Sequence, residues 1–332
     1  MAKLFKLILI GFVTIAVGLS LATVGYLNHG VNSIQLRHGR FFVPQEAKVH
    51  EKLTSFSKIN IAANAINVNI KRDNSISKPK IIARVDDSDD FTYEVNNGTL
   101  VVKYAQNGDY TGVGFGSSGS TYITVLLPRQ MSLKDIQLTG NDSGVILKQV
   151  TVAKLTANLT YSGLRLQQVN ADKVITSNKD SDLRTIKANI KNLQTTSHGG
   201  DVKLERSQIA NFDGDLEDGD VDIDRTTVSG DNKVMIADGN IKFTDATIST
   251  FAANLQESDV AMNRTTFTGK NTISIQDGDV SGGSVHVTGI EARISDGDLT
   301  VLGKKYVGHY QKNENAKDNL VLTVVDGDIA LN

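Results

Sequence analysis

The stretch DGDVDIDRTTVSGDNKVMIADGNIKF, residues 218–243, contains the same pattern near its two ends. In both places a short turn with glycine, DGD or DGN, is followed by an apolar residue. Comparable polar turns precede an apolar residue through the second half of the chain. These apolar residues are Val145, Leu164, Leu183, Val202, Val221, Ile241, Val260, Val280, Leu299 and Ile329. The first nine follow one another at steps of 19 or 20 residues, and a fixed period of this length predicts a solenoid.

Further apolar residues recur at fixed distances after each of these positions. Two residues later come Leu147, Leu166, Leu204, Ile223, Phe243 and Met262. Alternation within such short runs, interrupted by turns, predicts strands rather than helices. The predicted fold class is all-β, a parallel β-solenoid of the single-stranded β-helix type with coils of 19–20 residues. Equivalent strands of neighbouring coils would lie ~4.8 Å apart.

The Asp-Gly-Asp turns have a structural explanation and a chemical one. Each coil must turn at the same place, where glycine allows a positive φ and Asp or Asn can bond backbone amides. Stacked carboxylates could also attract cations, and oxygen ligands suit calcium. The candidate metal ligands are Asp218, Asp220, Asp277, Asp279, Asp296 and Asp298. No repeat matches a calcium-roll nonapeptide or an EF-hand loop, so specific calcium binding, nonspecific cation attraction and turn chemistry alone stay open.

The N-terminus combines two lysines with an uncharged run from Leu7 to Leu27. About 20 apolar residues suffice to cross a membrane as a helix. We predict an uncleaved signal anchor, a transmembrane helix within residues 1–29, that leaves the C-terminal domain extracellular on a single-pass membrane protein. The alternative is a removable signal peptide with a cleavage site near Ser20-Leu21-Ala22. The chain has no cysteine, which excludes disulfides and thiolate metal sites.

The rest of the chain divides by the regularity of its pattern. Residues 30–57 are predicted to be a juxtamembrane linker, residues 58–128 an irregular β cap with the first coils, and residues 129–332 the regular β-solenoid. Within the last part, residues 304–317 interrupt the period and are predicted to fold over the far end.

Charge is distributed unevenly along the chain. Residues 201–300 carry 19 acidic and 8 basic side chains, a net of −11, whereas the first 200 residues have a net of +9. One explanation is that aspartate serves simply as a turn residue. The other is that the basic, membrane-proximal part of the protein faces anionic lipid or wall polymer, while the acidic part faces outward. An acidic solenoid with few aromatic residues argues against a nucleic-acid partner.

Catalytic groups are sought first among the outward charges. Asp222, Asp224 and Arg225 are predicted to point outward, and Arg264 occupies the position of Arg225 two coils later. Polysaccharide-active β-helix enzymes use carboxylates on an exposed strand face, but an exposed ladder of charges is the simpler interpretation. The six histidines share no metal-ligand spacing. We therefore predict no catalytic residues, no cofactor and no enzymatic activity.

Three segments and the repeated turns together resemble a known family. The segments are FSKINIAANAINVNI (56–70), YEVNNGTLVVKY (93–104) and TYITVLLPRQMSLKDIQLTGNDSGVIL (121–147). Their order resembles the DUF4097 family of bacterial "putative adhesins" over roughly residues 55–332. The resemblance implies a β-solenoid on the outer face of the cell membrane, sometimes linked to cell-envelope stress. The family has no agreed catalytic residues.

These observations predict a membrane-anchored extracellular β-solenoid that acts as an adhesin-like surface binding module. Its expected partners are the cell membrane through the N-terminal helix and a wall polysaccharide, glycan, cationic peptide or membrane protein. One alternative is a structural surface assembly formed by end-to-end stacking. Another is a polysaccharide-active β-helix enzyme.

Overall fold

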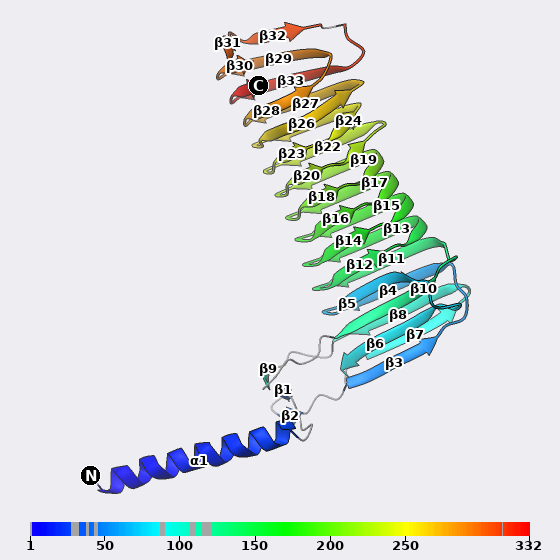
Figure 1. The fold of residues 1–332 in the computed structure, drawn as a ribbon, viewed down its shortest axis with the longest axis vertical. Helices are drawn as coiled ribbons and strands as arrows, with labels where there is room; N and C mark the ends of the chain where they lie inside the picture. The colour runs from blue at the N-terminus through cyan, green and yellow to red at the C-terminus, as the bar shows by residue number, and fades with distance from the viewer. Residues whose placement is uncertain are drawn as a thin grey trace.

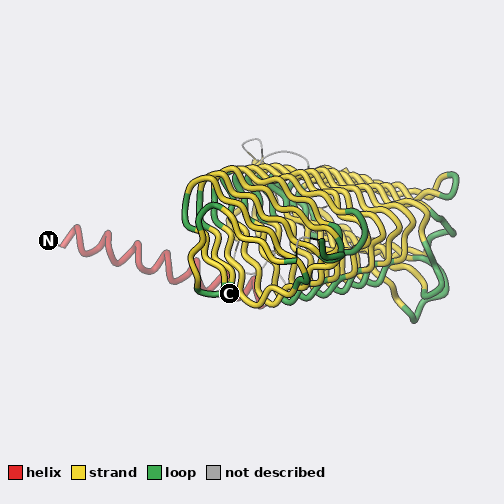
Figure 2. The backbone as a smooth tube through the Cα atoms, turned by 90° about the horizontal axis from the view of Figure 1, so that it is seen from above, coloured by secondary structure: helices red, strands yellow, loops and turns green. Residues whose placement is uncertain are grey.

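The computed structural model describes residues 2–27, 33–37, 40–42, 46–86, 90–106, 111–114, 121–313 and 315–332. Figure 1 shows one helix followed by a long stack of strands, and Figure 2 shows the same stack from above. Strands of neighbouring coils pair in parallel over most of the stack. The predicted all-β solenoid is therefore confirmed.

The helix α1 (Ala2–Leu27) coincides with the predicted apolar segment. Within the described part of the chain, no helix meets both the length and the hydropathy needed for a candidate membrane span. The predicted transmembrane helix is thus without support from the structure.

The longer strands form one side of the stack, the long-strand side, where nearly all neighbours are parallel. In spatial order they are β7 (Asp90–Asn96), β8 (Thr99–Ala105), β4 (Lys58–Asn64), β11 (Leu133–Asn141), β13 (Thr151–Thr160), β15 (Asn170–Lys179), β17 (Asn189–His198), β19 (Gln208–Glu217), β22 (Asn232–Ala237), β25 (Phe251–Gln256), β27 (Lys270–Asp277), β33 (Asn319–Asp326), β29 (Gly289–Asp296) and β32 (His309–Lys312).

Shorter strands form a second side, the short-strand side. In spatial order they are β3 (Glu46–Lys52), β6 (Lys80–Asp86), β10 (Tyr122–Pro128), β5 (Asn67–Asp73), β12 (Gly144–Lys148), β14 (Gly163–Gln167), β16 (Asp182–Ile186), β18 (Val202–Glu205), β20 (Val221–Asp224), β23 (Ile241–Thr244), β26 (Val260–Thr268), β28 (Val280–His286), β34 (Ile329–Leu331), β30 (Leu299–Val301) and β31 (Lys304–Tyr306). Two very short strands, β21 (Thr227–Val228) and β24 (Thr247–Ser249), continue a third side. A separate antiparallel sheet contains β1 (Ser33–Arg37), β2 (Arg40–Phe42) and β9 (Thr111–Gly114).

The register of the pairing reproduces the repeat read from the sequence. Val145 pairs with Leu164, and the equivalent residues of successive coils pair in the same way up to Val280. All ten residues that define the repeat are 3% exposed or less. Larger side chains fill the core in the coils of residues 241–268. There Phe243 packs edge-on against Phe251 and Phe267, with ring centroids 5.6 and 5.8 Å apart. Stacked apolar side chains thus form one continuous core.

The last coil does not follow chain order. The sequence repeat places Ile329 after Leu299, but β34 lies between β28 and β30, so Ile329 pairs with both Val280 and Leu299. Likewise β33 lies between β27 and β29. Residues 304–317 include β31 and β32, which pair antiparallel with β30 and β29 and cover this end of the stack, as predicted.

Antiparallel strands also form the opposite end. β7 pairs with β8, β6 with β10 and β3 with β6, all antiparallel. β3 falls in the segment predicted as a linker, so at least residues 46–52 belong to the sheet. Residues 30–32, 38–39 and 43–45 of that predicted linker lie outside the described residues.

The role predicted for glycine in the turns is only partly correct. Gly278, Gly297 and Gly327 do have positive φ. In the turns at residues 218–220 and 238–240 the positive φ belongs to Asp218 and Asp238 instead, at 55° and 54°. Glycine is required there by close packing, because a Cβ on Gly219 or Gly239 would collide with the carbonyl oxygen of the glycine in the coil before it.

We predict that Val221→Asp destabilises the solenoid by about 4 kcal/mol or more, because a carboxylate buried at this fully enclosed position has no partner. The matched control is Asn254→Asp, which places the same side chain on an exposed position of β25 and should change stability by less than about 0.5 kcal/mol. Thermal melting of both variants and of the parent protein measures this difference in stability. Equal cooperativity and equal melting temperature would contradict the inward position of Val221.

Candidate functional site

The third residue of each turn builds a hydrogen-bonded ladder along one corner of the solenoid. The backbone N–H of each member after the first donates to the side-chain Oδ1 of the member in the coil before it in the stack, over 2.7–3.1 Å. The members in spatial order are Asp182, Asp201, Asp220, Asn240, Asp259, Asp279, Asp328 and Asp298. We refer to this series as the acidic ladder. Its carboxylates satisfy turn amides that would otherwise lack a partner.

The six predicted metal candidates fall into two separate rows, and all six are exposed. Asp220, Asp279 and Asp298 are members of the acidic ladder. The other three precede the glycine, and two of these, Asp277 and Asp296, pair in register with Asp326 between them. Like charges at strand spacing repel one another. Neutral Asn240 in the ladder and Lys305, whose Nζ lies 2.7 Å from the Asp298 carboxylate, reduce this repulsion.

We predict that Asp279→Asn leaves stability unchanged or raises it, because Oδ1 still accepts the Asp328 N–H and one negative charge is lost. Asp279→Ala removes the acceptor and should cost about 1 kcal/mol. Thermal melting without added metal distinguishes the two variants. An Asn variant as unstable as the Ala variant would show that the charge itself, and hence a bound cation, matters at this position.

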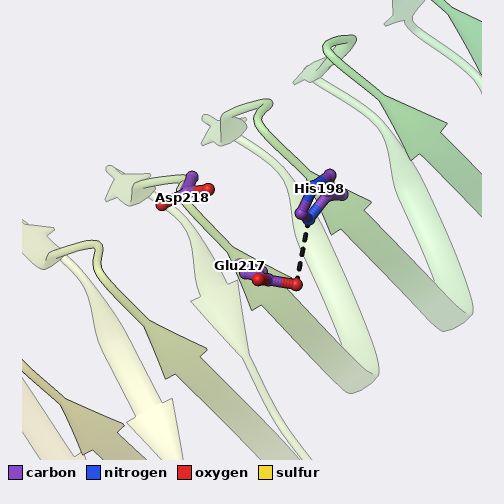
Figure 3. A group of neighbouring side chains, drawn as sticks. All are labelled: His198, Glu217 and Asp218. Carbon is purple, nitrogen blue, oxygen red and sulfur yellow. Dashed lines mark hydrogen bonds and ion pairs between the residues drawn. The ribbon is translucent and has the colours of Figure 1, made fainter.

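His198, Glu217 and Asp218 form a mixed cluster beside the ladder (Figure 3). His198 ends β17 and pairs in register with Glu217, the last residue of β19, while Asp218 is the first residue of the following turn. The Nδ1 of His198 lies 2.9 Å from Oε2 of Glu217. One ligand atom from each residue lies within 4.8 Å of the other two, and all three residues are exposed.

This cluster has the donor set of a divalent transition metal. One imidazole nitrogen and two carboxylates suit Zn²⁺, whereas Ca²⁺ prefers oxygen alone. Among the described residues, Asp218 is the sole member of the six predicted candidates that belongs to such a group. Sequence reasoning missed His198 because it compared histidines with one another. The signal was present nonetheless: His198 precedes Glu217 by one 19-residue period.

We expect Zn²⁺ to stabilise the metal-free protein more than Ca²⁺ does. At ten times the dissociation constant, Zn²⁺ should raise the melting temperature by roughly 2–4 °C. His198→Gln should abolish the shift, while the control His286→Gln, at an exposed position of β28, should keep it. A Zn²⁺ shift that survives His198→Gln, or a larger Ca²⁺ shift, would contradict this assignment.

The charges considered for catalysis are all held in ion pairs. Asp222 lies 2.9 Å from Lys203, and Asp224 lies 2.6 Å from Arg225. Arg264 pairs with Asp245 at 2.5 Å, and this hydrogen bond lowers the pKa of the Asp245 carboxyl. The hydrogen bond that Lys203 donates to Asp222 raises the pKa of Lys203, and the bonds that Arg225 donates to Asp224 raise the pKa of Arg225. The outward ladder of charges is thus a series of mutually neutralising pairs.

Two of the grooves along the short-strand side are lined by two or more charged side chains. One, of about 470 Å³, runs between the acidic ladder and the outward side chains Lys203, Asp222 and Lys242. The other, of about 300 Å³, lies nearer the N-terminal end and is lined by Arg72, Asn74, Arg129, Gln149, Gln168 and Asn170. We refer to the second as the arginine groove. Its lining side chains are all hydrogen-bond donors, and none is a carboxylate.

Comparison with known proteins gives a family match and distant structural likenesses. The family model described as Toastrack DUF4097 matches residues 56–332. The chain is similar to the crystal structure of a "putative adhesin" from Parabacteroides merdae ATCC 43184, at 16% identity over 73% of this chain and 93% of that chain, with a TM-score of 0.44. It is also similar to a "putative adhesin" from Bacteroides fragilis NCTC 9343, at 13% identity over 87% and 97% of the two chains, with a TM-score of 0.36.

A further likeness is to a "putative lipid binding protein" from Parabacteroides distasonis ATCC 8503, at 13% identity over 86% of this chain and 96% of that chain, with a TM-score of 0.39. No function follows from likeness at this level. No curated protein matches the chain.

Proposed function

This chain belongs to the Toastrack DUF4097 family, and on that basis we propose that it is a non-enzymatic, adhesin-like module that binds extended partners at the cell surface. The observation that carries the proposal is the register of the outward side chains. On the long-strand side, Thr139, Asn158, Ser177 and Thr196 are all exposed and pair in one line across β11, β13, β15 and β17.

Such a line offers one polar group per coil at strand spacing, ~4.8 Å. A regular row of hydroxyl and amide groups on a flat face can contact a polymer or a protein surface over many coils. By contrast, a small molecule is usually bound in a concave pocket that buries most of its surface. The repeat therefore favours extended partners, such as polysaccharides or proteins.

The ends of the stack argue against the alternative of end-to-end assembly. An exposed strand edge pairs readily with another chain unless charges or irregular strands protect it. Here one end is closed by the antiparallel strands β31 and β32, which carry the exposed residues Lys304, Lys305 and Lys312. The opposite end carries the antiparallel strands β3 and β7.

The proposal places the solenoid outside the cell, with residues 1–29 as the export and attachment segment. Supporting this, six large apolar side chains are exposed among those described on α1. They are Ile10, Phe12, Val13, Ile15, Val17 and Leu19, each 53–75% exposed. Apolar surface of this extent on one helix requires a lipid or protein environment.

We predict that an epitope tag placed after Asn332 is labelled by antibody on intact cells. External protease should remove the tag without lysis, and the protein should sediment with membranes after alkaline washing. A cytoplasmic marker protein provides the control for cell integrity. A tag that becomes accessible only after lysis would contradict surface display, and release by the alkaline wash would contradict attachment through α1.

A further inference from the structure

The arginine groove has the composition of an anion site. Arg72 is half-buried, and its Nη2 donates to the carbonyl oxygen of Met131 at the long distance of 3.4 Å. Its Nε is buried and lacks a hydrogen-bond partner among the residues that the structure describes. A buried charged donor without an acceptor is costly, so an acceptor from outside the chain would stabilise it.

Carboxylates near the groove are already engaged. Asp73, next to Arg72 in the chain, accepts hydrogen bonds from the backbone N–H and the hydroxyl of Ser75, at 2.9 and 2.6 Å. These bonds lower the pKa of the Asp73 carboxyl. Asp172, two residues beyond Asn170, lies 2.6 Å from Lys191. Both of these carboxylates thus have partners other than Arg72 and Arg129.

The groove opens onto a row of further donors along the same corner of the stack. One residue of each coil here has positive φ, between 47° and 57°, and its N–H donates to the next coil. These residues are Gln149, Gln168, Lys187, Arg206 and Arg225. We refer to them as the donor edge. All five are exposed, and the row contains no carboxylate before Asp245.

The adjoining short-strand side strengthens the positive charge. Arg165, Arg184 and Lys203 pair in register on β14, β16 and β18. Glu205, which is 6% exposed, lies 2.7 Å from Arg184, whereas the nearest carboxylate to Lys203 is Asp222, at 2.9 Å. Lys203 and Arg206 also lie within 4.0 Å of Glu205. Two carboxylates, Glu205 and Asp222, thus lie beside the three cations Arg184, Lys203 and Arg206, which leaves a net positive charge on the middle coils.

From this arrangement we infer that the arginine groove and the donor edge bind a linear polymer that carries tetrahedral oxyanions, phosphate or sulfate. The guanidinium group of arginine can donate two parallel hydrogen bonds to such an oxyanion. Donors repeated at ~4.8 Å intervals allow successive oxyanions of one chain to bind along the edge. The inference rests on the proposed function, since it names the class of extended partner.

The test measures binding of fluorescent linear polyphosphate to the full-length protein in detergent at low salt, by anisotropy. Arg72→Gln with Arg129→Gln should weaken binding at least 10-fold, and Lys187→Gln with Arg206→Gln at least 5-fold. The control, Arg293→Gln with Lys312→Gln, removes two exposed cations at the far end and should change affinity less than 2-fold. Salt should weaken the binding of the parent protein through screening.

Competing ligands identify the source and the chemistry. Stronger competition by heparin than by unlabelled polyphosphate would assign a sulfated glycan, and the reverse order a phosphate polymer, and each supports the inference. Polyglutamate competing equally, or free phosphate matching the polymer per phosphate group, would overturn it. So would unchanged affinity in both double variants, provided that they melt like the parent protein.

Failure here is separable from failure of the proposed function. If no polyanion binds but the tag after Asn332 is accessible on intact cells, the surface module stands and this partner class is wrong. If the tag is inaccessible, surface display fails irrespective of the anisotropy result.

Discussion

The whole structure depends on backbone hydrogen bonds between residues 19 or 20 positions apart. Each coil has two edges of unpaired N–H and C=O groups, and only another coil in the same register can satisfy both. The acidic ladder continues this pairing through the turns, where strand bonding would otherwise stop. Because one register holds for strand and turn alike, a shift by one residue would move Val221 and its equivalents out of the core.

The same register also sorts charge. Residues that occupy one position in successive coils form a column, so any preference at that position is multiplied along the stack. Aspartate accumulates at one corner because it bonds the neighbouring turn amide. At the opposite corner of the short strands, the residues with positive φ point outward without such a bond, and here Lys187, Arg206 and Arg225 occur. Charge is thus divided between two edges of the short-strand side, the acidic ladder at one and Lys187, Arg206 and Arg225 at the other.

The sequence was sufficient to predict the fold class and the buried positions, because both depend on local periodicity. Val145 and its nine equivalents all lie in the core. It was not sufficient where contacts skip a coil or depend on stacking geometry. The sequence pattern around Ile329 does not indicate that its strand lies between those of Val280 and Leu299, because all three residues occupy the same position of the repeat.

The candidate sites show the same limit. The carboxylates of the turns could be found from their spacing, but the acceptor role of Asp220 and Asp279 required knowing which amide lies beside each. Likewise, His198 and Glu217 become neighbours only through the register of β17 and β19. The arginine groove joins residues from β5, the end of β10 and two later turns, which no period connects.

The displaced last coil affects how the solenoid ends. Strands β33 and β34 are paired on both edges, and Leu320, Leu322 and Val324 are fully buried. The C-terminal residues therefore lie inside the stack, and the outermost coil is the earlier segment that contains β29 and β30. That segment is covered in turn by β31 and β32. A simple succession of coils would leave β33 and β34 on an open edge, where strands pair with other molecules. Insertion of β33 and β34 between two coils leaves lysine-bearing antiparallel strands at this end instead. The flat sides of the solenoid are then its main surface for contact with other molecules.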